Sequence, residues 1–345
     1  MNKLVVLDGD FKSELRRHFL MASTFGEDFP LKALKVDRWS VLKTHLAFLR
    51  AGAQIIRTNT YYASSGAVAA HLDLRLNDYS TLIERAVILA KQAVTKYGEE
   101  TGQDMSSEEY QLRRPLIAGS CGSAMVSISD VVFNKRSISA KFANERTQSY
   151  LEFFHDQRAR ELVAAGVDML AFESISTFRE VLSIFKVLKK YETVRAWITL
   201  YCPQDTKLMD GTEFSGVAAY CYNTLHKQEI MAIGVECDFP ETIMPTIRNL
   251  NDSYKDKIPC VLYADKNYIL PVTENTAGSS TMLQHNHVQE WWNVGIRYIG
   301  GGIHTVAEDI QQIRKQVDNF CKFKNEIFPF QRSYPYRKEK SLSVL

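Results

Sequence analysis

Residues 37–58, DRWSVLKTHLAFLRAGAQIIRT, contain one complete helix–strand unit, and the fold prediction starts from this unit. Leu42, Leu46 and Leu49 recur at helical spacing, and the pattern closes on Gly52, as is typical of a helix end. The next residues, Gln54–Thr58, form a short apolar run rich in β-branched side chains. Such a run is expected of a strand that is buried on both faces of a parallel sheet.

The same alternation recurs along the chain. Helical patterns are found in residues 79–98, 153–168 and 178–191. The first pattern closes on Gly98 and the second on Gly166, as is typical of helix ends. The predicted strands are Leu4–Leu7, Gln54–Thr58, Leu116–Gly119, Asp168–Phe172, Ala196–Leu200, Met231–Val235, Cys260–Tyr263 and Arg297–Ile299. Eight strands alternating with helices predict an α/β protein of the (β/α)₈ TIM-barrel class, whose parallel sheet closes on itself. An open doubly wound sheet is the alternative.

Composition limits the classes of function. The 345 residues are 45% hydrophobic and 24% charged, with a formal net charge of +2, so overall charge requires neither a nucleic-acid nor a membrane partner. The six cysteines form no C-x-x-C pair, which favours a reducing compartment. Neither a signal-peptide pattern nor a run of about 20 apolar residues is found. We expect a cytoplasmic protein with a small-molecule ligand and leave an oligomer open.

Two polar inserts and a tail interrupt the alternation. We expect residues 97–114 to be exposed and residues 265–285, which are rich in turn formers, to form a loop. Residues 1–325 are predicted to form one domain. The basic tail, residues 326–345, is expected to be partly disordered.

Polar residues follow nearly every predicted strand. In a (β/α)₈ barrel the chemistry gathers at the carboxyl ends of the strands, so these residues predict a pocket for a small polar ligand. They include Asp8-Gly9-Asp10, Thr58–Tyr62, Ser120–Ser123, Glu173-Ser174, Glu236–Asp238 and Gly300–His304.

These motifs resemble those of the homocysteine S-methyltransferase family. The segments LDGD (7–10), AGAQIIRTNTYYAS (51–64), AGSCGS (118–123), AGVDMLAFESI (165–175), DGT (210–212), GVECDFPE (234–241) and GIRYIGGGIHT (295–305) occur in the family's order and at about its spacing. The resemblance runs from about residue 4 to about residue 315 and implies a (β/α)₈ barrel. It also implies methyl transfer from betaine, S-methylmethionine, S-adenosylmethionine or a methyl-folate to homocysteine, giving methionine.

The resemblance further implies a zinc ion held by three cysteine thiolates. Zinc lowers the pKa of a bound thiol and keeps its sulfur nucleophilic. Cys237 matches the first ligand position, whereas the other two positions fall on Gly302 and Ile303, which have no donor atoms. We therefore expect zinc to be absent or weakly bound. A substitute site of Cys237, His304 and an acid such as Glu236 or Asp238 is the alternative, and an ordinary buried cysteine is another reading of Cys237.

The other implied site residues bind the substrates. Asp8, Gly9 and Glu173 match positions that hold the amino-acid part of homocysteine, although either carboxylate could instead cap backbone amides. The aromatic residues Phe25, Trp39, Tyr61 and Tyr62 are candidates for the pocket of a cationic methyl donor, with core packing as the alternative for Trp39. The segment YYAS resembles the betaine-using branch and FPE the S-methylmethionine-using branch, so the donor stays open.

Two functions follow from this pattern. One is a homocysteine S-methyltransferase-like enzyme with a degenerate zinc site. The other is a catalytically inactive family member that binds an amino acid or a methyl donor as a sensor or partner subunit. Metal content and methionine formation separate the two.

Overall fold

The computed structural model describes residues 3–20, 29–72, 77–125, 148–191, 193–203, 206–224, 230–237, 242–252, 254, 256–264, 266 and 287–323. Its strands are β1 (Val5–Val6), β2 (Ile55–Arg57), β3 (Leu116–Gly122), β4 (Met169–Ile175), β5 (Arg195–Cys202), β6 (Ile230–Cys237), β7 (Cys260–Ala264) and β8 (Ile296–Gly301). Its helices are α1 (Phe11–His18), α2 (Phe29–Val36), α3 (Arg38–Arg50), α4 (Ser65–Leu72), α5 (Asn77–Glu100), α6 (Glu108–Arg113), α9 (Gln148–Ala164), α10 (Phe178–Leu188), α11 (Phe214–Thr224), α12 (Ile243–Asp252), α14 (His287–Val294) and α15 (Ala307–Phe323).

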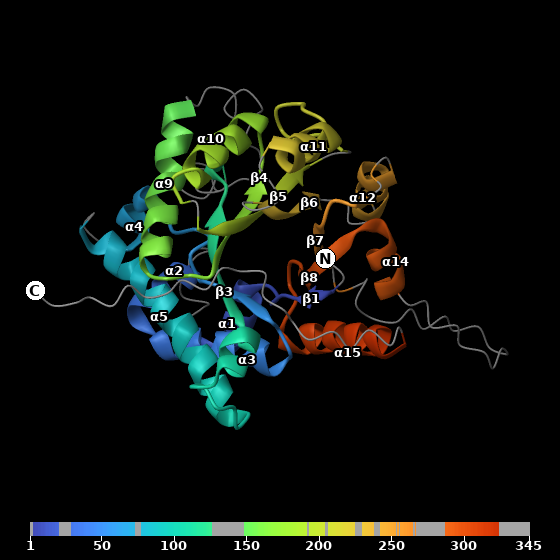
Figure 1. Ribbon diagram of the computed structural model, residues 1–345. Coiled ribbons are helices and arrows are strands. Elements are labelled where there is room, and N and C mark those ends of the chain that lie inside the picture. The colour runs from blue at the N-terminus through green and yellow to red at the C-terminus, as the bar shows by residue number, and fades with distance from the viewer. Residues whose placement is uncertain are drawn as a thin grey trace, which may run out of the picture.

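The strands form one eight-stranded sheet in the order β1-β8-β7-β6-β5-β4-β3-β2, and every pairing is parallel. The remaining seam, between β1 and β2, is bridged where Leu7 pairs with Ile55. On that seam the Gln54 N–H donates to the Val6 carbonyl at 2.7 Å. The helices surround the strands (Figure 1). The predicted (β/α)₈ barrel is confirmed, and the open sheet is excluded.

Alternation along the strands separates two apolar layers. One side of each strand faces the surrounding helices and joins the main core, to which Val6, Ile56 and Ile198 belong. The other side faces the barrel axis, where a second cluster is built from Val5, Leu7, Ile55, Leu116, Ala118, Met169, Ala171, Trp197, Met231, Ala232, Val261 and Tyr298. A barrel interior filled by side chains is the expected packing. This axis-facing cluster, called the apolar plug below, lies beneath the polar residues at the carboxyl ends of the strands. That end of the barrel is called its mouth.

The predicted helices are confirmed, although several of their ends differ: α9 begins at Gln148, before the predicted residue 153, and α10 ends at Leu188, before the predicted residue 191. Helix α3 is capped at its start by Asp37, whose carboxylate accepts from the Ser40 N–H at 3.1 Å, and it closes before Gly52, whose φ is +98°. Helix α5, however, runs through Gly98 to Glu100. Gly98 is a contact point rather than a helix end, because a Cβ there would lie 2.7 Å from the Tyr110 hydroxyl.

The strand ends also differ from the prediction. Strands β3, β4, β5 and β6 each extend past their apolar runs, so that Ser120, Glu173, Ser174 and Glu236 lie within strands and not after them. Ladder hydrogen bonds continue because polar side chains that point into the barrel mouth do not interrupt backbone pairing.

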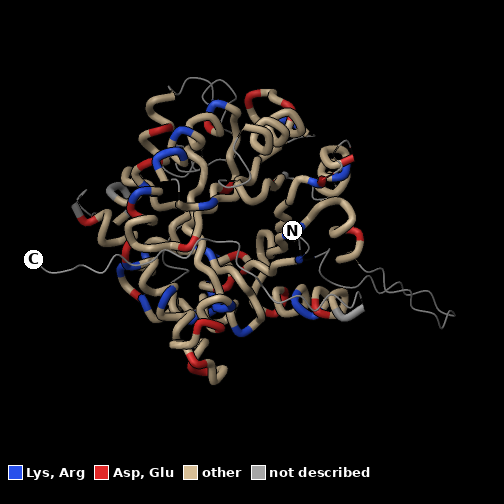
Figure 2. Tube along the Cα trace, in the orientation of Figure 1, with Lys and Arg blue, Asp and Glu red and all other residues tan. Residues whose placement is uncertain are grey.

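The surface has no single electrostatic character. Lys and Arg alternate with Asp and Glu around the helices, consistent with the small net charge (Figure 2). The insert at 97–114 contains the short helix α6. None of the described helices combines the length and the apolar character that a transmembrane span requires. The insert at 265–285, apart from Lys266, and the tail at 326–345 lie outside the described residues.

Candidate functional site at the carboxyl ends of the strands

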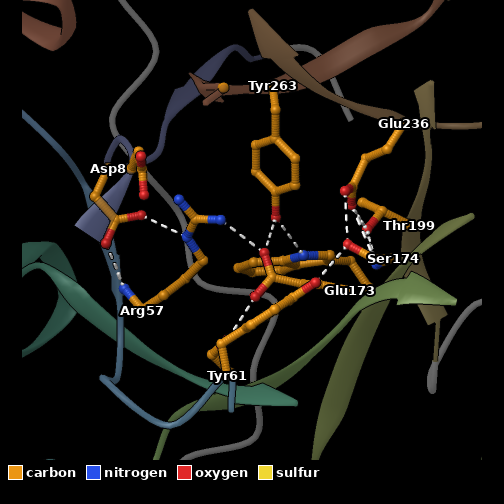
Figure 3. Close-up of polar contacts among 12 residues, drawn as sticks. Asp8, Arg57, Tyr61, Glu173, Ser174, Thr199, Glu236 and Tyr263 are labelled. Atoms are coloured by element: carbon orange, nitrogen blue, oxygen red, sulfur yellow. Dashed lines mark hydrogen bonds and ion pairs between the residues drawn. The ribbon is translucent and has the colours of Figure 1, made fainter. Parts of the chain in front are cut away.

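The mouth of the barrel holds an ion-pair cluster formed by Asp8, Arg57 and Glu173 (Figure 3). Arg57 donates from Nε to Asp8 Oδ1 and from Nη1 to Glu173 Oε1, both at 2.7 Å. Its backbone N–H donates to Asp8 Oδ2 at 2.7 Å, and Nη2 donates to the Gly9 carbonyl, also at 2.7 Å. Two predicted substrate-binding carboxylates are thus brought together, with an arginine of the same chain between them.

Strand periodicity explains why Arg57 points into the mouth. Ile55 faces the barrel axis and Ile56 faces the helices, so Arg57 faces the axis again, directly above Ile55. The same rule places Glu173 above Ala171 and Tyr263 above Val261. These side chains therefore form a polar layer on top of the apolar plug.

Tyr263 completes the cluster. Its hydroxyl donates to Glu173 Oε1 at 2.6 Å, and the Arg57 guanidinium lies 4.7 Å from the centre of its ring. Below it, Trp197 Nε1 donates to the Tyr263 hydroxyl oxygen at 3.0 Å. Ser120 Oγ donates to Glu173 Oε2 at 2.6 Å.

Burial and charge act in opposite directions on this cluster. Burial raises the pKa of Asp8, an effect that Arg57 partly offsets. Burial alone would lower the pKa of Arg57, but the charges of Asp8 and Glu173 outweigh it and hold that pKa well above its usual value. Burial, followed by the charge of Glu173, raises the pKa of Tyr263. Arg57 therefore stays a cation and Tyr263 a neutral hydrogen-bond donor at any ordinary pH.

A second polar group surrounds Glu236 on the other side of the mouth. Thr199 Oγ1 donates to Glu236 Oε1, and Ser174 Oγ donates to Glu236 Oε2 at 2.7 Å. Tyr61 donates from its hydroxyl to Ser174 Oγ at 2.8 Å. Burial raises the pKa of Glu236, and the hydrogen bonds from Thr199 and Ser174 oppose that rise.

Ser174 has a strained backbone. Its φ of +57° lies in the left-handed region, and it sits at a register shift of the β4–β5 pairing between Phe172 and Ile175. Outside glycine and asparagine such a conformation persists where the surrounding contacts fix it, and these sites are often functional. Here the irregularity turns Ser174 toward both Tyr61 and Glu236.

The end of β8 is poor in chemistry. Gly302 has no side chain, and Ile303 is 74% exposed. His304 is also exposed, with a φ of +66°, and its backbone N–H donates to Asp10 Oδ2 at 3.1 Å. Asp10 itself caps α1 through Lys12 N–H and Ser13 Oγ, so its carboxylate serves the helix start. Among the described residues, no three His, Cys, Asp or Glu side chains lie together in a way that could hold a metal ion.

The structure separates the predicted aromatic residues. Tyr61 and Tyr62 pack edge to face, with ring centres 4.8 Å apart, beside the Glu236 group. Trp39 is 53% exposed on α3, with the amines of Lys43 and Lys96 5.6 Å and 5.1 Å from its ring centre. It is therefore not brought together with the two tyrosines. Phe25, Asp238 and the side chain of Cys237 lie outside the described residues.

Arg158 of α9 fixes the loops that carry Tyr61. It is fully buried and donates to the carbonyls of Thr60, Tyr61 and Gly122 at 3.2, 2.6 and 2.9 Å. Nearby, Glu180 accepts from Ser123 Oγ at 2.9 Å and lies 2.8 Å from His155 Nε2. His155 is thus packed and not solvated, as is His45.

Sequence reasoning missed Arg57, Thr199 and Tyr263. All three lie in segments that were interpreted only as buried strands. The signal that identifies them is the two-residue period of a strand, which places each on the axis-facing side at the carboxyl end. Asp8 and Glu173 could be found because they follow predicted strands and match substrate-binding positions of the family that the sequence resembles.

Comparison with known proteins agrees with this architecture. The family model described as homocysteine S-methyltransferase matches residues 5–317. A betaine-homocysteine S-methyltransferase of Drosophila melanogaster is 28% identical over 324 residues, covering 91% of this chain and 94% of that protein. A homocysteine S-methyltransferase of Escherichia coli strain K12 is 26% identical over 317 residues, covering 90% and 94%.

A solved structure is also similar. The metallated form of the homocysteine methyltransferase MmuM from Escherichia coli has a TM-score of 0.71 and 25% sequence identity to this chain, covering 91% of it and 96% of MmuM. Sequence family, barrel and strand-end residues point to the same group of proteins. The chain belongs to the homocysteine S-methyltransferase family.

Proposed function

We propose that this chain is a family member that binds a small molecule at its barrel mouth and does not carry out zinc-dependent methyl transfer to homocysteine. Its relatives are named for transfer to homocysteine, from betaine in one case. Transfer of that kind needs a nucleophilic sulfur, and a free thiol with a pKa near 8.5 is mostly protonated at neutral pH. A bound zinc ion would lower the pKa of that thiol, so the proposal depends on whether this mouth can hold zinc.

The observation that carries the proposal is the end of β8. Gly302 and Ile303 stand where the family resemblance implies two thiolates, and neither offers a donor. The backbone also packs closely around Gly302, whose N–H donates to the Ala264 carbonyl at 2.8 Å. A Cβ at this position would lie 3.1 Å from the Tyr263 carbonyl oxygen and 3.3 Å from that of Ala264. The described residues therefore do not fit a three-thiolate zinc site.

The other part of the proposal, small-molecule binding, rests on the polar side chains at the other strand ends of the mouth. Buried polar side chains from β2, β3, β4, β5, β6 and β7 converge there, and Ser174 is held in a strained conformation. Clusters of buried titratable groups and backbone strain are both concentrated at functional sites. The carboxyl ends of barrel strands are where ligands of this fold bind.

The test is to measure metal and activity on the same purified protein. Zinc content is determined by mass spectrometry, and methionine formation from L-homocysteine is assayed with betaine, S-methylmethionine, S-adenosylmethionine and a methyl-folate. MmuM from Escherichia coli, prepared in parallel, is the positive control. We expect well under one zinc per chain and no methionine above background, together with a thermal shift from at least one donor or thiol.

The contrary result is well defined. About one zinc per chain with methionine formation, both lost in Cys237→Ser, would establish a rearranged catalytic site that uses Cys237 and establish the enzyme reading instead. Absence of any thermal shift with all donors and thiols would reject the binding half of the proposal. A cytoplasmic location and a single domain over residues 1–325 stay predictions.

A further inference from the structure

The Asp8–Arg57–Glu173 cluster leaves no carboxylate oxygen without a donor. Both oxygens of Asp8 accept from Arg57, one from Nε and one from the backbone N–H. Glu173 Oε1 accepts from Arg57 and Tyr263, and Oε2 accepts from Ser120. Asp8 is fully buried and Glu173 is 3% exposed. Two acids that face the barrel mouth are thus satisfied entirely by the chain itself.

Two buried carboxylates this close to one another need a cation. Desolvation destabilises each buried charge unless an opposite charge and hydrogen bonds compensate for it. A ligand's ammonium group could supply that cation, but Arg57 already does. The guanidinium is also held from two further directions, by the Gly9 carbonyl at 2.7 Å and by the ring of Tyr263. Displacing it would leave a buried arginine without partners.

We propose that Arg57 is a specificity-determining residue which takes the place of a ligand's ammonium group on Asp8 and Glu173. The mouth then selects small molecules that carry no ammonium group for these carboxylates, and α-amino acids bind poorly. This inference rests on the proposed function, since it names the class of small molecule that the same mouth accepts. It assigns the two carboxylates to an internal ion pair and not to direct ligand contact.

The decisive variant is Arg57→Gln, which removes the cation and leaves both carboxylates. Thermal unfolding of wild type and variant is followed with increasing L-homocysteine or methylguanidinium chloride, with sodium chloride matching the ionic strength. We expect the midpoint of the variant to rise saturably by about 2–4 °C with either compound, because its ammonium or guanidinium group replaces the lost guanidinium of Arg57. The wild-type midpoint should shift by less than about 1 °C.

Two control variants make this result specific. Arg57→Lys keeps a cation between the carboxylates and should gain no response to either probe. Arg114→Gln breaks a second partly buried pair, in which Arg114 Nη2 lies 2.6 Å from Asp168 Oδ1 before the start of β4. It should lower stability without creating a response. A wild-type response to L-homocysteine as large as that of Arg57→Gln would overturn the proposal, as would a folded Arg57→Gln that responds to neither probe.

If Arg57→Gln does not fold, its refolding yield gives the answer. Refolding in methylguanidinium chloride should then recover more soluble protein than refolding in the same concentration of sodium chloride. Equal yields would contradict the proposal. The methylguanidinium ion is chosen because it has the planar fork of the arginine side chain that it replaces.

A comparison on the wild type separates this inference from the proposed function. L-Homocysteine and 4-mercaptobutyrate differ by the amino group, so a mouth that rejects that group should give the larger thermal shift with 4-mercaptobutyrate. A thermal shift with L-homocysteine that equals or exceeds the shift with 4-mercaptobutyrate counts against the role of Arg57, whatever the metal content. Zinc binding with methionine formation counts against the proposed function, whatever the ratio between these two compounds.

Discussion

Two regions of the barrel mouth differ in the polar side chains that they carry. Between β1, β2 and β4, two carboxylates, a guanidinium and their hydroxyl partners satisfy one another completely. At the end of β8, Gly302 contributes no side chain and Ile303 exposes hydrocarbon to solvent. The polar groups of the first region are occupied by one another, and the second region offers no side-chain donor atoms at Gly302 and Ile303. The difference teaches that one barrel can pair its polar strand-end groups internally in one part of its mouth and carry no polar side chains at another strand end.

The largest expected effect comes from a substitution that disrupts the Asp8–Arg57–Glu173 cluster. Glu173→Ala leaves Arg57 partly unpaired and removes the acceptor of the Tyr263 and Ser120 hydroxyls, so the free energy of unfolding should fall by about 3–5 kcal/mol. The matched control is Glu308→Ala, which breaks an exposed pair with Arg17 and should cost about 1 kcal/mol or less. Urea unfolding at neutral pH measures both. Equal losses would show that the buried cluster contributes no more than a surface pair.

A smaller expected effect is the pH dependence of the free energy of unfolding that His45 causes, away from the mouth. His45 of α3 lies fully buried against Phe11 of α1, and neither of its ring nitrogens has a hydrogen-bond partner among the described residues. Burial lowers the pKa of His45 to about 3. The unfolded chain, with an ordinary histidine pKa near 6.5, takes up a proton that the folded chain refuses, so stability is full above pH 6.5 and is lost as the pH falls below it.

The magnitude follows from the same linkage. Between pH 7 and pH 4.5 this histidine should cost the folded state about 2.5 kcal/mol. His45→Phe keeps an aromatic ring against Phe11 and removes the titration, so the stability gap between variant and wild type should widen by that amount on acidification. Urea unfolding at several pH values measures it. Parallel pH curves would mean that His45 is hydrated or paired in the folded protein.

The smallest effects fall on the side without donors. Gly302→Ala places a Cβ against the carbonyls of Tyr263 and Ala264 and should cost about 1–3 kcal/mol, because the β7–β8 backbone must shift. Ile303→Ser exposes no new surface and should change stability by less than about 0.5 kcal/mol. Thermal midpoints of the two variants test this order. A neutral Gly302→Ala would show that a cysteine at this position also fits without strain.

Much of the fold was predictable because each strand is an apolar run bounded by helix signals. All eight runs became strands of one barrel, and α3, α5, α9 and α10 formed where helical spacing indicated them. The ends of β3 to β6 were placed too early, since polar residues that face the mouth resemble loop residues in a list of hydrophobicities. Only the period of the strand distinguishes the two.

The candidate site was predictable in part. Asp8 and Glu173 stood out as acids at strand ends, yet their partner Arg57 was hidden inside the run QIIRT. A linear pattern also cannot show that Arg57, 116 residues before Glu173 in the chain, supplies its counter-charge. The left-handed Ser174 was equally hidden, because no glycine or asparagine marks that position. Such features depend on how eight strands meet, which only the assembled barrel shows.

Arg158 has a consequence for engineering this scaffold. Its side chain extends from α9 to three backbone carbonyls, two in the segment after β2 and one at the end of β3. These hydrogen bonds fix both segments to a helix that comes later in the chain. A loop transplanted after β2 would therefore need backbone carbonyls placed to accept hydrogen bonds from Arg158. Otherwise α9 would have to be exchanged together with the loop. Laboratory recombination of this barrel should succeed when crossovers keep residues 58–164 as one inherited block.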